Sequence, residues 1–290
     1  MGKNSEHKLI PVELPDDELF YQRPFFAYGI FKEGQLAYSK IEDFTEQIEP
    51  GDIPRKLYIR DGLPVIIGED DENYNTKGDK IYFNEKKKAY EIISNTQPGN
   101  IFKWDTKVIG DETFNILITE NIEGTFVNVD KDGNYLEDFD GSEDPFFSRV
   151  PSFIDDELKK IDVEDDDSIF KIQMYYMLLW SAIDRYCTLK YDVSNKQSDY
   201  LKKLSEDEVF IEAFESVRPK ARDEIRSAIN ASPFYFNRRR KNYIINYYYT
   251  IRSNVVHRGK EGKNNIDALK DSLYDLLDIF NEMIKNTFKS

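Results

Sequence analysis

The chain has 290 residues, 40% hydrophobic and 14% aromatic, with a formal net charge of −15; this composition is globular and leaves room for two domains. The single cysteine, Cys187, can form no internal disulfide, which fits a reducing compartment. Because the uncharged run at residues 172–183 falls short of the roughly 20 residues that cross a bilayer and the N-terminus leads into no apolar signal segment, we expect a cytoplasmic protein that binds no membrane.

The N-terminal part of the chain carries patterns of β structure. Residues 1–22 are polar and contain two prolines, and we expect a flexible tail. From Phe25 a strand pattern runs into a turn bracketed by Gly29 and Gly34. Two more strand patterns, a short helix and an aromatic segment follow at residues 55–66, 78–83, 89–98 and 102–104. These patterns predict a β-rich domain over residues 23–150.

This order of elements resembles the γ-glutamylcyclotransferase-like fold, a small mixed β-barrel, over roughly residues 23–110. The resemblance implies a pocket formed by the opening loop and the end of the short helix, with the residues Tyr28, Gly29, Ile30, Phe31 and Gln97. Gln97 stands where that family has a catalytic Glu, and an amide cannot act as a general base. We therefore expect a scaffold or a pocket that senses a small molecule, and cyclotransferase activity through the nearby Glu91 is the alternative.

Closely spaced aspartates between Asp130 and Asp140 invite comparison with a calcium-binding loop. The sixth position of that loop should be Gly and is Tyr135, and the twelfth should be Glu and is Gly141. We therefore expect an Asp-Gly hairpin turn there, and the sequence predicts neither a metal site nor a cofactor. The acidic segment 151–167 that follows is predicted to be a linker.

Residues 168–290 carry helical patterns throughout. The segment 169–191 is apolar on nearly every face, as expected of a central buried helix. Shorter helices, a tyrosine-rich helix from Asn242 and a final amphipathic helix follow it. The predicted fold class is thus α+β with two domains, the second an all-α up-and-down bundle. Its residues carry a net charge of +5, against −14 for residues 1–150, which suits contact with a polyanion.

The tyrosine-rich helix contains the strongest motif of the chain. Its apolar stripe consists of Ile244, Tyr248, Ile251 and Val255, and Arg252 and His257 lie beside that stripe. The Arg-x4-His spacing on the penultimate helix, followed by Arg-Gly and a final amphipathic helix, resembles the HEPN domain. Many members of that superfamily are RNA-cleaving toxins and antiviral defence proteins.

The HEPN resemblance implies a metal-independent endoribonuclease that works as a homodimer. His257 would transfer protons, Arg252 would bind the phosphate, and Ser253 and Asn254 would fill the polar position after the Arg. Attack by the 2′-hydroxyl would leave 2′,3′-cyclic phosphate ends. Five residues of α-helix turn by about 140°, so a two-fold dimer is the expected way to bring Arg and His together.

Basic residues near the motif are predicted to contact RNA. They are Arg238, Arg239, Arg240, Lys241, Arg258 and Lys260. Two other interpretations stay open: the cations at this helix end only stabilise its dipole, or the domain is a non-catalytic HEPN module that dimerises and binds nucleic acid. In each case the acidic N-terminal domain would act as a sensor or regulator that meets a small molecule or a protein.

Overall fold

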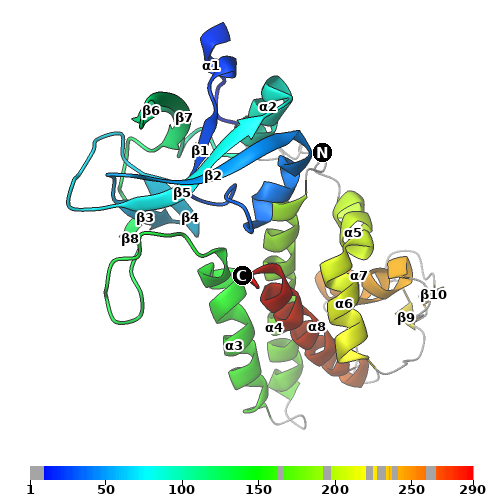
Figure 1. Ribbon diagram of the computed structural model, residues 1–290. Helices are drawn as coiled ribbons and strands as arrows, with labels where there is room; N and C mark the ends of the chain where they lie inside the picture. Colours follow the sequence, from blue (N-terminus) through cyan, green and yellow to red (C-terminus); the bar gives the residue numbers. More distant parts are fainter. Residues whose placement is uncertain are drawn as a thin grey trace, which may run out of the picture. The chain divides into compact units, whose positions relative to one another are not determined.

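The computed structural model describes residues 10–161, 166–191, 197–219, 225–226, 233–234, 236, 241–258 and 266–289 (Figure 1). The chain divides into two compact units, Met1–Gly141 and Ser142–Ser290. The first contains mixed β-sheets with helices and the second is built from helices α3 to α8 with one short strand pair, so the predicted α+β architecture in two parts is confirmed.

The first unit is built around a mixed sheet. Between residues 10 and 141 the sheet has five strands in the order β2-β5-β1-β7-β6, and only the pair β1 and β7 is parallel. A second sheet has the order β4-β3-β8. The strands are β1 (Phe25–Ala27), β2 (Thr45–Ile53), β3 (Leu57–Arg60), β4 (Leu63–Ile66), β5 (Thr76–Phe83), β6 (Lys103–Ile109), β7 (Glu112–Ile118) and β8 (Phe126–Val127). The strand predicted at 78–83 is therefore present, whereas the single strand predicted at 55–66 is a hairpin of β3 and β4 that turns at Asp61 and Gly62.

Aromatic side chains form the core of this unit. Helix α2 (Lys86–Thr96) places Tyr90 in full burial between Phe20 and Trp104, with ring centroids 4.7 Å and 5.5 Å away. The Tyr90 hydroxyl donates a hydrogen bond to the carbonyl of Arg23. Short 3-10 helices occupy Leu36–Lys40, Glu42–Phe44 and Gly141–Glu143.

Residues 10–22, predicted to belong to a flexible tail, pack on this core instead. Helix α1 (Glu18–Gln22) buries Phe20, and the backbone N–H of Val12 donates to the carbonyls of Ser94 and Gln97 at 3.2 Å and 3.1 Å. The Ser94 hydroxyl donates in turn to the carbonyl of Val12. The buried side chains of Val12 and Phe20 anchor this segment, although its polar composition alone predicted a flexible tail. Residues 1–9 lie outside the described part of the chain.

The predicted Asp-Gly turn is present between Val129 and Tyr135, which form an isolated antiparallel bridge. The Asp130 carboxylate accepts hydrogen bonds from the backbone N–H groups of Asp132 and Asn134 at 2.8 Å and 2.9 Å. Gly133 takes a positive φ of 85° at the turn. Asp130 therefore organises the backbone of its own turn.

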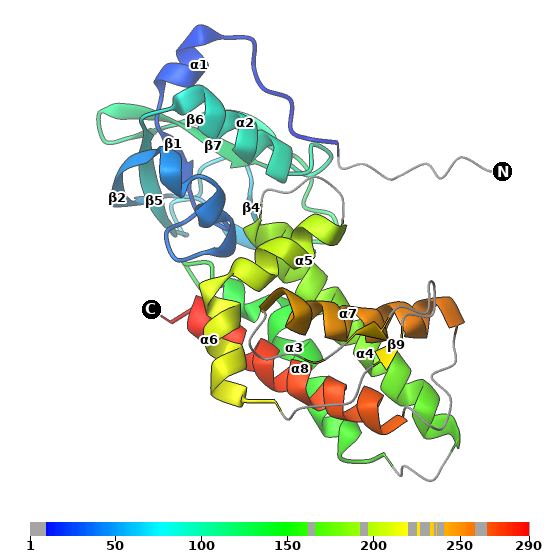
Figure 2. The ribbon, with the colours of Figure 1, turned by 90° about the vertical axis from the view of Figure 1, so that its right-hand side faces the viewer.

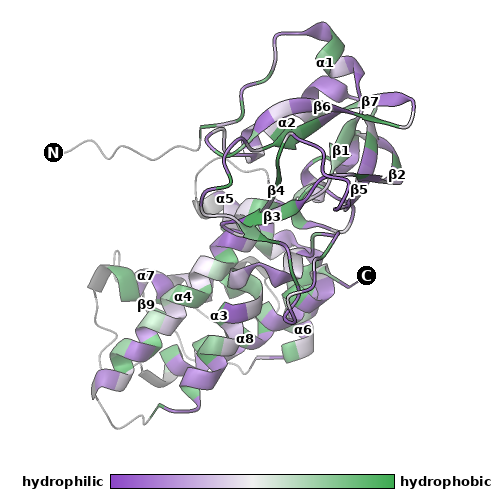
Figure 3. Ribbon diagram, turned by 90° about the vertical axis from the view of Figure 1, so that its left-hand side faces the viewer, coloured by the Kyte–Doolittle hydropathy of each residue, from purple (hydrophilic) through white to green (hydrophobic). Residues whose placement is uncertain are grey.

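The helices of the second unit are α3 (Pro145–Leu158), α4 (Asp166–Lys190), α5 (Gln197–Glu206), α6 (Glu208–Val217), α7 (Lys241–Arg258) and α8 (Ile266–Thr287), and the strands β9 (Ile225–Arg226) and β10 (Pro233–Phe234) form a small antiparallel pair. Figure 3 shows hydrophobic and hydrophilic residues mixed along these helices, as expected of helices with one buried side. Trp180 and Tyr176 of α4 are buried, but Phe170 and Met174 are 63% and 62% exposed, so this helix is buried on part of its surface and not on nearly every face as predicted. Within the described residues, no helix combines the length and apolarity needed to cross a membrane.

Helix α3 lies where the sequence predicted the end of the first domain and the start of an acidic linker. Its buried Phe147 contacts the rings of Tyr186 in α4 and Phe280 in α8, at 6.4 Å and 6.1 Å between centroids. Asp144 caps the helix by accepting from the Phe146 backbone N–H, and it also accepts from two nitrogens of Arg185 at 3.1 Å and 3.0 Å. The boundary thus falls after Gly141, because α3 buries an apolar face among the other helices.

Candidate functional site

The motif residue Arg252 lies on α7, and the predicted stripe of this helix is largely confirmed. Ile244, Tyr248 and Ile251 are buried, and Val255 is partly exposed. Arg252 is also partly exposed, and its guanidinium carbon lies 5.5 Å from the centroid of the Tyr249 ring. The side chain is therefore beside the core, as its helical position predicted, with an aromatic face supporting its cation.

The Nε atom of Arg252 is buried and has no hydrogen-bond partner among the described residues. A buried donor without an acceptor costs roughly 1–3 kcal/mol, and the cost rises for a charged group. Arg252 is thus permanently charged, and its Nε–H is a donor that the described residues of the chain leave unused.

Helix α4 lies next to α7 (Figure 2). The Tyr176 hydroxyl donates to the carbonyl of Tyr248 at 2.9 Å, and the rings of Trp180 and Tyr249 are 5.7 Å apart. Asp184 comes one turn after Trp180. Burial raises the pKa of the Asp184 carboxyl and the charge of Arg252 opposes that rise, so the two groups are electrostatic neighbours.

Sequence reasoning missed Asp184 as a neighbour of the motif. Its signal was the four-residue spacing from Trp180, which places both side chains on one face of a helix. A carboxylate near Arg252 supplies an opposite charge to a guanidinium that is partly removed from water.

The predicted catalytic residues Ser253 and Asn254 are both buried in the described structure. Their burial places them on the packed side of α7, whereas Arg252 is partly exposed. A role in direct contact with substrate stays a prediction for both, and their position suits support of the helix.

Positions 252 and 257 both fall within the continuous helix α7. Regular helical geometry therefore separates Arg252 and His257 by about 140° around the axis, so the helix does not unwind to bring them together. The side chain of His257 lies outside the description.

The predicted RNA-contacting residues fall largely outside the described structure. Arg238, Arg239, Arg240 and Lys260 are not described, and Lys241 and Arg258 are placed only as the two ends of α7. Their contact with RNA stays a prediction.

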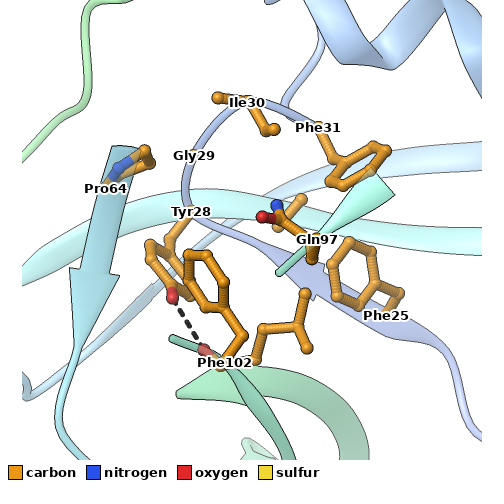
Figure 4. Close-up of a pocket in the computed structure, with 10 residues that line it drawn as sticks. Phe25, Tyr28, Gly29, Ile30, Phe31, Pro64, Gln97 and Phe102 are labelled. Atoms are coloured by element: carbon orange, nitrogen blue, oxygen red, sulfur yellow. Dashed lines mark hydrogen bonds between the residues drawn. The ribbon is translucent and has the colours of Figure 1, made fainter. Parts of the chain in front are cut away.

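The first unit contains the second candidate site, a cavity of about 20 Å³ (Figure 4). All five residues predicted for an N-terminal pocket line it, and Phe25, Ala27, Pro64, Phe102 and Leu117 complete the wall. The Tyr28 hydroxyl donates to the carbonyl of Leu117 at 2.7 Å, the bond dashed in Figure 4, and burial raises the pKa of this phenol. The structure thus brings together residues that are up to 92 positions apart in the sequence.

Gly29 and Gln97 give this cavity its particular form. A Cβ added at Gly29 would lie 2.2 Å from Cγ of Pro64, so only glycine allows the loop to approach β4 this closely. Gln97 is only 5% exposed and its side-chain oxygen has no hydrogen-bond partner among the described residues. Figure 4 shows its amide directed toward the loop of residues 28–31.

The lining residues of the cavity include no carboxylate, and Glu91 lies on the exposed side of α2. The described residues therefore supply no general base at this cavity, although they supply hydrogen-bonding groups.

No protein-family model, no curated protein and no solved structure matches the chain.

Proposed function

We propose that the second unit is a metal-independent endoribonuclease. The observation that supports it is the Nε donor of Arg252, buried beside Tyr249 and without an acceptor among the described residues. A phosphate oxygen is the natural acceptor for such a group, because a guanidinium fork matches phosphate geometry and keeps its charge at every physiological pH. Binding a phosphate would remove the cost of the unpaired donor.

The reaction follows from the residue types of the motif. The neutral imidazole of His257 takes the proton of the 2′-hydroxyl, and the 2′-oxygen attacks the adjacent phosphorus. The bond from phosphorus to the 5′-oxygen then breaks, and the imidazolium of His257 gives its proton to the leaving oxygen. Arg252 stabilises the charge that builds on the phosphate oxygens. The products carry a 2′,3′-cyclic phosphate and a 5′-hydroxyl, and DNA is inert because it lacks the 2′-hydroxyl.

A two-fold dimer completes this site. Arg252 and His257 of one chain lie on different sides of α7, so a second copy is needed to place an Arg opposite a His. Phe170 and Met174 stand one turn apart on α4 and are 63% and 62% exposed, while Val256 of α7 is about half exposed. Exposed apolar side chains on helices of the same bundle suit contact with another protein surface, and we propose that a second copy covers them.

Regulation is the role proposed for the first unit, which carries most of the chain's negative charge. Counted by the observed boundary, residues 1–141 have a net charge of −13 and residues 142–290 one of −2. The bases predicted for RNA binding are thus balanced by acids of residues 142–167 within the same unit, and RNA contact depends on where charges lie rather than on their sum.

Cleavage of a mixed RNA pool in EDTA tests the ribonuclease proposal. The wild type should cleave and leave 2′,3′-cyclic ends, while Arg252→Ala should lose on the order of 10²–10³ in rate and His257→Ala on the order of 10²–10⁴. Arg149→Ala is the matched control, since it removes an exposed Arg of α3. Cleavage that requires a metal, or that survives both motif substitutions, would overturn the proposal.

A non-catalytic module that binds nucleic acid is the second candidate. The burial of Ser253 and Asn254 favours it, because these side chains then offer substrate little surface. This candidate predicts salt-dependent RNA binding that weakens in Arg252→Ala, with no cleavage by any variant.

A further inference from the structure

Four residues that line the cavity of the first unit carry hydrogen-bonding groups that the described residues leave unused. Within the described residues, the backbone N–H groups of Gly29, Ile30 and Phe31 donate to no acceptor, and the side-chain oxygen of Gln97 accepts from no donor. All four residues are buried. The carbonyls of Gly29 and Ile30 are occupied, since they accept from the N–H groups of Lys32 and Ala37, so the loop is held in place while its donors stay unpaired.

These groups call for a bound partner. Each unpaired buried polar group costs roughly 1–3 kcal/mol, and native proteins satisfy nearly all of them. The cavity of about 20 Å³ exceeds the minimum for one water. Its walls are the aromatic rings of Phe25, Phe31 and Phe102, which suit a planar end group better than a lone water. The volume admits the end of a ligand, with the remainder outside.

The charge of the lining residues limits the chemistry of that end group. No acidic or basic side chain is among the described residues that line the cavity. An ammonium group would therefore lose its water without gaining an opposite charge, which is costly, and a carboxylate would have no N–H to donate to the unpaired oxygen of Gln97. A neutral group is required, and it must accept hydrogen bonds from the loop N–H groups and donate one to Gln97.

A carboxamide meets both conditions. We propose that this cavity binds the primary carboxamide end of a small molecule, whose carbonyl accepts from the loop of residues 29–31 and whose NH₂ donates to Gln97. The two ends of the Gln97 amide can exchange by rotation, and a carboxamide remains complementary to either arrangement. Binding here is without turnover, and the proposal is independent of the ribonuclease function.

Methyl NMR on the full chain tests the proposal. With isoleucine methyl groups labelled, the Ile30 signal, assigned by an Ile30→Val variant, is followed during titration with acetamide, acetone and acetate. These probes have nearly the same shape, but acetone lacks the N–H donor and acetate carries a charge. Acetamide should produce a saturable shift at a concentration roughly tenfold lower than acetone or acetate, as expected for one additional hydrogen bond.

Two glutamine substitutions distinguish binding in this cavity from the general effect of losing a buried amide. Gln97→Met should weaken acetamide binding roughly tenfold. Gln173→Met is the matched control, because Gln173 is 7% exposed and also has a buried unpaired amide atom but lies on α4, and it should leave binding unchanged. Equal binding of acetone or acetate would overturn the proposal, as would the absence of any saturable shift, which would mean a cavity that holds water only. The three-probe comparison on the wild type remains decisive if Gln97→Met fails to fold.

Discussion

At the scale of single residues, each candidate site contains a polar atom that the fold buries and the described residues leave unpaired. Arg252 has an unused donor and Gln97 an unused acceptor. Chance burial of such groups is selected against because each weakens the fold. Asp144 is as buried as Gln97, but its carboxylate accepts hydrogen bonds from Arg185 and from the backbone N–H of Phe146. Its hydrogen-bonding capacity is therefore used within the fold, and its role is structural.

Gly29 gives a test at this scale. Gly29→Ala places a methyl group within 2.2 Å of Cγ of Pro64, so the loop or the proline must move. We expect a loss of about 1–3 kcal/mol in the free energy of unfolding, measured by urea denaturation. If the clash with Pro64 is the cause, the double variant Gly29→Ala/Pro64→Ala should recover much of that loss. Purely additive losses would show that the close approach to Pro64 is not what requires glycine.

At the scale of elements, strand β2 and helix α3 are among the segments that differ from what their sequence predicted. Strand β2 was not predicted, because its residues include Pro50 and Gly51 and alternate poorly. It forms at an edge of the sheet, where β5 supplies its hydrogen-bonding partners from Thr76 to Phe83. Helix α3 was assigned to a domain end and a linker because residues 151–167 are rich in acids, but its four buried residues lie on one helical face.

The N-cap of α3 is the feature to test here. Asp144→Ala removes the acceptor for the Phe146 N–H and the carboxylate that pairs with Arg185. We expect a loss of about 2–4 kcal/mol in the free energy of unfolding, from the cap and the largely buried ion pair together. Asp144→Asn keeps a capping oxygen and should lose less. The measurement is chemical denaturation of the whole chain, and a neutral Asp144→Ala would contradict the role given to this residue.

At the scale of the whole molecule, the proposed ribonuclease depends on two copies of the chain. In a two-fold dimer each composite site takes Arg252 from one copy and His257 from the other. A mixed dimer of Arg252→Ala and His257→Ala chains would then keep one intact site of two, and the other site would lack both residues.

Mixing the two inactive variants tests this arrangement. Random exchange makes half of the dimers mixed, so an equal mixture should recover about a quarter of the wild-type rate. Substituting Phe170 and Met174 by Asp should abolish this recovery and the dimer itself, as measured by light scattering. Phe126→Asp is the matched control, since Phe126 is also exposed but belongs to the first unit. No recovery from a mixture whose chains are shown to exchange would contradict a composite site.

The sequence by itself indicated the central, tyrosine-rich and final helices of the second unit, strand patterns within 55–66 and 78–83, the turn at Asp130 and five of the residues that line the N-terminal cavity. Hydrophobic periodicity and the conformational preferences of glycine and other turn residues depend on neighbours a few positions away, so they can be read from the sequence alone. Only the tertiary structure decided that Ser253 and Asn254 are buried, that Asp184 is near Arg252, that α3 joins the helical unit and that Gln97 lacks a partner. Burial and hydrogen-bond pairing depend on residues far apart in the chain, such as Tyr176 and Tyr248 or Gly29 and Gln97, which only the fold brings together.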